Sequence, residues 1–489
     1  MAGPGMMAAD SPPRRLLLLA LLMALLGTTG LALGYSEKVQ LVAVVVALLI
    51  CIGAVSARYP WFAVGLPLLI FADLGISMST GYSVAGVSLN WADLLLLPAV
   101  LPTVVRIAHG SRRFPVPNKA AALLLVLVGL ATLLGVYYGN ETAVIRNELH
   151  VLLYIFLAYF LAVTELRTRN DLRALLIMFM IAISLAGVKA IAIALIGSLA
   201  ADMSLFQTVD ISSQQLEGTR IILLGADTLF VVAIPILVAL AVYVRNRLTN
   251  FFLAAAAIPI CAGVLLGLSR SNWAAAAIAA LLTLVLGLKA KGLKSLRTGL
   301  IALAGLILTL LLVSAFYYNS YNNSFFDIIQ RRFSFNPSEG SGTMDYRIME
   351  GDALLAVARH HIVLGSGLGS EYSYVDYRGL LITNWSHDGY LFLILKSGII
   401  GLALFLLAMF LTIWKSVSLA QRSDDGLLAS TGVGMSMALL ALLLMSTLLN
   451  RISNMEGTYF IGLAVATPVV LASLQGKSNI PDVRNNEIE

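Results

Sequence analysis

Four residues of this chain carry a charge or a titratable ring near the edge of an apolar stretch: Arg220, Arg270, Arg347 and His387. An arginine stays charged and presents a planar fork of N–H donors that matches the oxygens of a phosphate. Three arginines around one cavity would therefore suit a diphosphate. The structural alternative is that each arginine reaches lipid headgroups or pairs with a carboxylate in a loop.

His387 is the candidate general base. An imidazole titrates near neutral pH, so it can take a proton from a hydroxyl group. We expect Ser386 to cap the helix that follows, which would place the ring near the positive end of the helix dipole and favour its neutral form. The structural alternative is a histidine at the membrane interface with no role in chemistry.

Other polar groups indicate no metal or nucleotide. The run Gly365-Ser366-Gly367-Leu368-Gly369 lacks both a preceding strand and the Gly-Lys-Ser/Thr of a phosphate-binding loop, so we interpret it as a flexible turn. Neither the histidines nor Cys51 and Cys261 show the spacing of a metal site or a disulfide framework. Four charged residues within apolar stretches are interpreted as paired structural groups, or as an ion path if the protein is a transporter: Asp73, Asp93, Lys189 and Asp227.

The composition indicates the scaffold that positions these groups. Of 489 residues, 59% are hydrophobic and 12% are charged, whereas ordinary soluble domains have about 25% charged residues. Because a spanning helix needs about 20 apolar residues, the sequence predicts an all-α polytopic membrane protein with about fourteen transmembrane helices. The predicted spans lie near 15–34, 39–57, 60–77, 90–107, 118–138, 149–165, 172–197, 221–244, 250–268, 271–288, 298–318, 389–414, 428–449 and 457–475.

Lysine and arginine predict the orientation. The net charge of +6 is spread over short basic clusters between apolar runs, which is typical of cytoplasmic membrane loops rather than of a nucleic-acid-binding surface. These clusters fall in alternate connections, for example at Arg112 and Arg113 and at Lys289 and Lys291. We therefore expect both termini in the cytoplasm. Arg220, Arg270, Arg347 and His387 would then all lie at the outer interface, which is periplasmic in a Gram-negative cell.

The spans and the polar loop suggest a division of the chain. We expect an N-terminal transmembrane bundle of about eleven spans over 1–318 and a large periplasmic loop over 319–387. This loop would contain short helices, including one from Arg347 to about His361. The C-terminal transmembrane helices would occupy 388–475, and 476–489 would form a cytoplasmic tail.

Ordered motifs extend over about 215–410. They are Gly218-Thr219-Arg220, Leu268-Ser269-Arg270-Ser271-Asn272-Trp273, Tyr346-Arg347, Leu364-Gly365-Ser366-Gly367-Leu368-Gly369, His387-Asp388-Gly389-Tyr390-Leu391 and Lys396-Ser397-Gly398-Ile399-Ile400-Gly401-Leu402. Together they resemble the motifs of the O-antigen ligases and the related Wzy-type O-antigen and exopolysaccharide polymerases. Two features depart from the family pattern. Asp388 stands where the family usually has Asn, and fourteen spans exceed the roughly twelve that are common in ligases, which makes a polymerase at least as compatible as a ligase.

The resemblance implies a GT-C-like fold and a metal-independent, inverting glycosyltransferase with no cofactor, in the bacterial inner membrane. The donor would be a glycan linked to undecaprenyl diphosphate, and the acceptor either a second lipid-linked repeat unit or the lipid A core. Arg220, Arg270 and Arg347 would hold the diphosphate, and His387 would take the proton from the attacking hydroxyl. The implied partners also include membrane lipids and a chain-length regulator or flippase of the same pathway, but no nucleic acid.

Two other functions use the same residues differently. A polysaccharide transporter or lipid-linked glycan flippase would use the arginines as an anion site and would form no glycosidic bond. Such a protein is expected to carry charges through the depth of the bilayer, whereas here they gather at its outer edge. A protein O-oligosaccharyltransferase would transfer the glycan to periplasmic proteins instead.

Overall fold

The structure is a computed structural model in which most of the chain can be described. The described residues are 37–72, 82–84, 87–89, 91–196, 215–216, 219–220, 226–244, 246–267, 269–292, 309, 337–376 and 379–478. The predicted span at 15–34, the predicted span at 298–318 apart from residue 309, and Asp73 lie outside these residues. The predicted division of the chain into a bundle, a loop and a tail stays a prediction.

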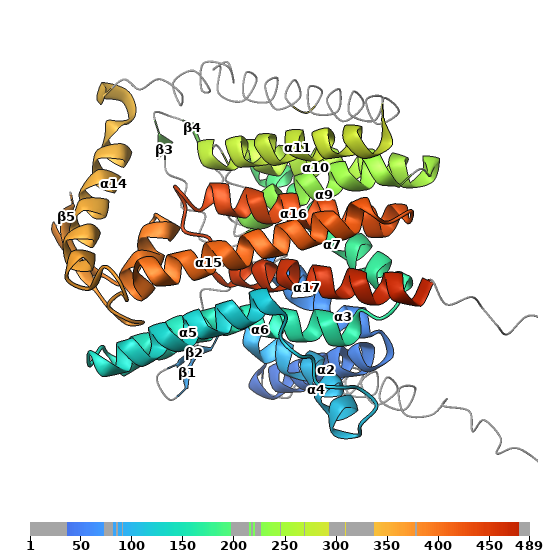
Figure 1. Cartoon of the computed structure of the whole chain (residues 1–489), viewed down its shortest axis with the longest axis horizontal. Helices are drawn as coiled ribbons and strands as arrows, with labels where there is room; N and C mark the ends of the chain where they lie inside the picture. Colours follow the sequence, from blue (N-terminus) through green and yellow to red (C-terminus); the bar gives the residue numbers. More distant parts are fainter. Residues whose placement is uncertain are drawn as a thin grey trace, which may run out of the picture.

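Long helices dominate the described part of the chain (Figure 1). They are α2 (Glu37–Arg58), α3 (Pro60–Phe71), α4 (Trp91–Ala108), α5 (Lys119–Tyr137), α6 (Thr142–Glu165), α7 (Arg169–Ile196), α9 (Asp227–Tyr243), α10 (Arg247–Leu266), α11 (Arg270–Lys291), α14 (Pro337–Ala358), α15 (Gly389–Gln421), α16 (Gly426–Met445) and α17 (Met455–Ser478). Eight of them, α5, α6, α7, α10, α11, α15, α16 and α17, are long and apolar enough to cross a membrane. The protein is therefore a mostly helical, polytopic membrane protein. The count of fourteen spans stays a prediction.

Among the eight candidate spans, α16 and α17 are the most deeply buried within the protein. The most apolar windows of α16 and α17 are 83% buried, whereas that of α11 is 28% buried. Because lipid is as apolar as leucine, close contact between such helices depends on small residues that let backbones approach. Gly462 of α17 is one, since a Cβ there would lie 2.1 Å from the carbonyl oxygen of Ile155 in α6.

The helix α14, one turn of 3-10 helix and short strands gather at one end of the bundle, on the left of Figure 1. They are α14 with the single turn η1 (Arg359–His361), and three antiparallel hairpins: β1 (Tyr82–Val84) with β2 (Val87–Leu89), β3 (Gln215–Leu216) with β4 (Thr219–Arg220), and β5 (Tyr372–Asp376) with β6 (Gly379–Thr383). A small core of Leu354, Ala358, Tyr372, Tyr374 and Leu395 joins α14 and β5 to α15. This core sets the position of α14 over the start of α15.

Candidate functional site

A carboxylate from α14 holds His387, and the sequence pattern does not reveal it. The His387 Nδ1 atom lies 2.9 Å from Glu350 Oε2, and the His387 backbone N–H donates to Glu350 Oε1 at 3.0 Å. Because an ionised carboxylate only accepts hydrogen bonds, Nδ1 carries the proton in the neutral ring and Nε2 carries the lone pair. The side chain of Glu350 is 3% exposed and that of His387 is 28% exposed. The pair thus combines an oriented imidazole with a path to solvent.

Tyr372 completes the surroundings of this carboxylate. Its hydroxyl lies 2.7 Å from both Glu350 Oε1 and the carbonyl oxygen of Trp385. Burial acts to raise the pKa of Glu350, but the hydrogen bonds from His387 and Tyr372 outweigh it, so this pKa lies below its ordinary value. Burial and the neighbouring carboxylate raise the pKa of Tyr372, which therefore stays a protonated donor. Glu350 is thus a stable anion beside the imidazole.

The residue that caps α15 lies two positions after the one that the sequence suggested. Asp388, not Ser386, caps α15: its Oδ1 accepts from the backbone N–H groups of Tyr390 at 2.8 Å and Leu391 at 3.0 Å. Ser386 Oγ instead accepts from the Asp388 N–H at 3.2 Å. Asn and Asp are both good N-caps, so the departure from the family pattern at Asp388 leaves this contact intact.

The three arginines lie on separate elements around this end of the bundle. Arg347 lies three residues before Glu350 on α14 and is partly buried. Arg270 is the first residue of α11 and is also partly buried, and Arg220 lies in β4, opposite Gln215. The side chain of Arg220 lies outside the described part of the chain. The convergence of these guanidinium groups on His387 stays a prediction.

Backbone contacts nevertheless join the segments that carry these residues. The turn between α16 and α17 touches the start of α15, because the Gly389 N–H donates to the Ser446 carbonyl at 2.8 Å. The same turn reaches α9, where Arg451 Nη2 lies 3.7 Å from Asp227 Oδ2. Asp227 in turn adjoins the α10–α11 connection, since a Cβ on Gly267 would lie 3.5 Å from Asp227 Oδ1. The starts of α9, α11 and α15 therefore lie on one side of the bundle.

The glycine run 365–369 is a tightly packed element, so its interpretation as a flexible turn is wrong. Gly365, Gly367 and Gly369 have φ values of +82°, +79° and +77°, a region that glycine adopts without strain. A Cβ on Gly367 would lie 2.0 Å from the backbone nitrogen of Gly135 in α5. The Asn140 side chain donates to the carbonyl oxygens of Ser366 and Leu368 at 2.9 and 2.8 Å. The run is thus held between α5 and α15.

A break in α15 supplies part of this packing. Gly398 has φ +65° inside the helix, which frees backbone groups on both sides of it. The Ser366 N–H donates to the Leu395 carbonyl at 2.8 Å, and the Gly367 N–H donates to the Lys396 carbonyl at 3.0 Å. The backbone groups released by the kink are therefore satisfied by the loop, as buried polar groups must be.

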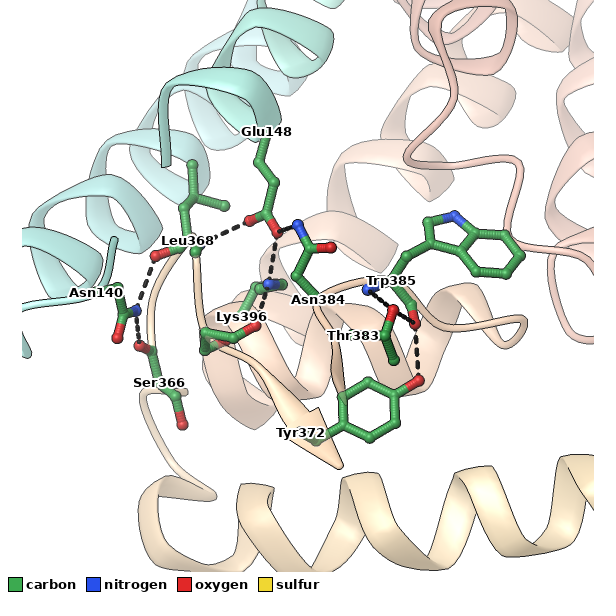
Figure 2. A network of polar contacts seen from close by, with 11 residues as sticks. Asn140, Glu148, Ser366, Leu368, Tyr372, Thr383, Asn384, Trp385 and Lys396 are labelled. Carbon is green, nitrogen blue, oxygen red and sulfur yellow. Dashed lines mark hydrogen bonds and ion pairs between the residues drawn. The ribbon is translucent and has the colours of Figure 1, made fainter. Parts of the chain in front are cut away.

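A second, partly buried carboxylate, Glu148 of α6, ties the glycine run to the segment before His387 (Figure 2). One oxygen accepts from Lys396 Nζ at 2.7 Å and from Asn384 Nδ2 at 2.9 Å. The other accepts from the Gly369 N–H at 2.8 Å. Lys396 also donates to the Ser370 carbonyl at 2.7 Å, and its side chain is 2% exposed. Glu148 and Lys396 therefore fix the frame that carries His387.

Two of the charged residues within apolar stretches are paired, as expected. Asp93 Oδ1 accepts from the Tyr154 hydroxyl at 2.5 Å and lies 2.8 Å from His150 Nε2. Asp227 pairs with Arg451. Neither pair lies within the contacts that hold His387.

An apolar cavity lies among α3, α6, α7, α9, α16 and α17, away from this site. Leu68, Phe179 and Met435 are among its lining residues, and Thr431 and Thr467 are its polar ones. Thr431 precedes Ser446 by fifteen residues, which corresponds to about 22 Å along α16. None of the described residues that line the cavity is charged, so we assign it no part in the chemistry.

Comparisons with known proteins agree with the resemblance in the sequence. A model of the O-antigen ligase family matches residues 254–406, a segment that contains Arg270, Arg347, Glu350 and His387. No curated protein matches the chain. Among solved structures, a chain from the work described as "Structural coordination of polymerization and crosslinking by a peptidoglycan synthase complex" aligns with 74% of this chain and 98% of its own length. Its identity is 15% and the TM-score is 0.38, which is too low to support an argument.

Arg220 and the α16–α17 turn lie outside the matched segment. The match covers the kinked part of α15 and the glycine run that packs against it. Residues 254–406 therefore resemble the O-antigen ligase family, and this likeness covers about a third of the chain.

Proposed function

We propose that this chain is an integral membrane glycosyltransferase that moves a glycan from undecaprenyl diphosphate to a sugar hydroxyl on the periplasmic face of the inner membrane. The observation that carries this proposal is the pair of Glu350 and His387. A buried, ionised carboxylate on Nδ1 orients the ring and stabilises the imidazolium that forms when Nε2 accepts a proton. A histidine with a purely interfacial role does not need such a partner.

In the proposed reaction His387 Nε2 takes the proton of the acceptor hydroxyl. The hydroxyl oxygen forms a bond to the anomeric carbon of the donor while the bond from that carbon to the diphosphate oxygen breaks. The diphosphate leaves with the electron pair, and the configuration at the anomeric carbon inverts in this single displacement. Arg220, Arg270 and Arg347 would offset the charge that develops on the leaving group. No metal or cofactor takes part in this scheme.

The Glu148–Lys396 frame supports the proposal indirectly. Asn384 lies three residues before His387, and its side chain donates to Glu148 at 2.9 Å. A base must lie within hydrogen-bond reach of the proton that it removes, so the segment that carries it must be held rigidly. Contacts from α6 on one side and from α14 on the other provide that rigidity.

The test replaces His387 with Ala in the full-length chain, expressed in a strain that lacks the native gene. We expect polymer formation or ligation to be abolished while the membrane level of the protein is unchanged. Arg270→Lys should also lose most activity, because a point charge cannot replace a bidentate fork. His360→Ala is the matched control, since His360 is an exposed histidine of the same region. Normal glycan from His387→Ala would reject the base assignment.

Glycan profiles of the deletion strain separate the alternatives. Single repeats that reach their anchor without chain growth indicate a polymerase, whereas lipid-linked polymer that never reaches the lipid A core indicates a ligase. Altered mobility of periplasmic glycoproteins would indicate a protein O-oligosaccharyltransferase. If the purified protein translocates glycan without forming a new glycosidic bond, the protein is a transporter or flippase rather than a glycosyltransferase.

A further inference from the structure

The turn between α16 and α17, residues 446–454, lies beside His387 but belongs to none of the motifs above. The Gly389 N–H donates to the Ser446 carbonyl at 2.8 Å. A Cβ on Gly389 would lie 3.1 Å from Asn450 Oδ1, so Asn450 packs against the first residue of α15. Gly389 follows His387 by two residues. This turn is therefore a wall of the region in which the reaction would occur.

Arg451 in this turn has one guanidinium donor that no described residue satisfies. Its side chain is 18% exposed, and its ion pair with Asp227 spans 3.7 Å, which is longer than a hydrogen bond. The Nε atom is buried and has no hydrogen-bond partner among the described residues. A guanidinium offers five N–H donors and no acceptor, and leaving such donors unpaired in the interior is unfavourable. An arginine in this state is poised to bind an anion.

Asn450 supplies a second unsatisfied donor next to it. The residue is 1% exposed, and its Nδ2 atom is buried without a partner among the described residues. Its Oδ1 accepts from the Ser453 N–H at 3.3 Å, which assigns the oxygen and the nitrogen of the amide. Two adjacent residues of the turn thus each carry a buried N–H donor that has no partner among the described residues. Oxygens of a phosphate group are the natural acceptors for such a pair.

We propose that Asn450 and Arg451 form an anion subsite that binds the diphosphate of the lipid-linked donor. This proposal rests on the proposed function and adds a further substrate-binding arginine to it. In the absence of substrate Asp227 provides a distant counter-charge, and a phosphate oxygen that approaches the guanidinium replaces it. A phospholipid headgroup offers the same phosphate chemistry, but the position beside His387 favours the diphosphate.

The test measures the affinity of the full-length chain in neutral detergent for inorganic pyrophosphate and for farnesyl diphosphate. Arg451→Gln should weaken the binding of both by about tenfold or more, because a charge-assisted hydrogen bond is lost. Arg451→Lys should recover part of that loss. Asp227→Asn should tighten binding several-fold, because it removes the carboxylate that competes for the guanidinium. Arg146→Gln, at an exposed arginine of α6, is the matched control and should leave the affinity unchanged.

A merely structural ion pair would not produce opposite changes in affinity in Arg451→Gln and Asp227→Asn. The subsite is overturned if Arg451→Gln binds as the wild type does, or if both variants lose affinity only in step with a lower unfolding temperature. Phosphatidylglycerol that displaces farnesyl diphosphate at equal concentration would assign the subsite to a lipid headgroup and would overturn the diphosphate assignment.

The same experiments keep the two proposals apart. Weak pyrophosphate binding by Arg451→Gln, together with normal glycan from His387→Ala, would support the subsite and reject the proposed function. Unchanged binding by Arg451→Gln, together with glycan loss in His387→Ala, would reject the subsite alone.

Discussion

Two carboxylates hold the chain around His387 from opposite sides, and they do so in different surroundings. Glu148 of α6 binds Lys396, whose side chain is 2% exposed, whereas Glu350 of α14 binds His387, whose side chain is 28% exposed. Both carboxylates accept several N–H or O–H groups, and both lie near the start of α15. The two carboxylates differ in their partners: the Lys396 ammonium is sealed from solvent, whereas the His387 ring can be reached from it.

This contrast separates a structural ion pair from a candidate catalytic one. A sealed lysine with a carboxylate and a carbonyl as acceptors has no room for a substrate, so its contribution is to fix the backbone. An imidazole that is fixed at Nδ1 and partly open can exchange a proton. The sealed pair should therefore affect mainly stability when it is changed, and the open pair should affect mainly activity.

The largest effect on stability is expected from Lys396→Met. Removing the lysine leaves the Glu148 charge buried without its cation, which should cost about 3–5 kcal/mol of the free energy of unfolding. The double variant Glu148→Gln with Lys396→Met should recover much of this loss, because neither charge then remains. Denaturant unfolding in detergent of the wild type, the single variants Glu148→Gln and Lys396→Met, and the double variant measures the coupling energy between the two residues. Strictly additive losses would show that the pair is not a unit.

A second test concerns the glycine run that the sealed pair supports. Gly367→Ala combines φ +79° with a Cβ only 2.0 Å from the Gly135 nitrogen, so we expect a loss of more than about 2 kcal/mol. Gly139→Ala is the matched control, with φ +73° and no atom within 4 Å of the new Cβ, and should cost about 1 kcal/mol. Equal losses in the two variants would mean that the run is not packed as described.

At the open pair, Tyr372→Phe should shift the pH dependence. The folded-state pKa of Glu350 lies below its ordinary value, so the stabilising contribution of its charge is present above the ordinary pKa and is lost as the pH falls through the folded-state pKa. Loss of the phenol O–H removes one of the bonds that lower this pKa, so the loss begins at a higher pH. The acid limb of the transfer activity should move to higher pH. An unmoved acid limb would contradict the role of Tyr372.

The smallest effect is expected at the helix cap between the two pairs. Asp388→Asn should change the free energy of unfolding by less than about 0.5 kcal/mol, because Asn accepts the same backbone N–H groups. Asp388→Ala should cost about 1 kcal/mol, because it leaves those groups unpaired. Thermal unfolding in detergent resolves the two. A loss for Asn as large as that for Ala would show that the charge, rather than the cap, matters.

Much of the scaffold follows from the sequence, because a lipid environment forces backbone groups into helices wherever the chain is apolar. The family motifs likewise follow from residue types in order. Contacts between distant segments do not follow from the sequence in this way. Glu350 and His387 are 37 residues apart, on a helix and in a loop, and no spacing rule joins them. The sequence likewise does not reveal the burial of Arg451, because that burial depends on how the α16–α17 turn packs.

The interpretation of the glycine run shows a related gap. Glycines at positive φ look alike in sequence whether they lie in solvent or against another backbone. What distinguishes the run is its partners, the kink at Gly398 and the close approach of Gly135, and both lie on other helices. The prediction of Ser386 as the helix cap was wrong for a simpler reason. Serine and aspartate are both good capping residues, and which of Ser386 and Asp388 caps α15 depends on the residue at which the helix begins.

The role of Glu350 in orienting His387 is tested most directly by the turnover of Glu350→Gln. The measurement is kcat and KM for glycan transfer by the purified full-length chain, with the unfolding temperature of each variant alongside. We expect kcat to fall about 10²–10⁴-fold, because the ring loses the anion that orients it and stabilises its protonated form, while KM changes little. A kcat within about twofold of the wild type, from a variant that remains folded, would contradict the assignment of Glu350 and His387 as the catalytic pair.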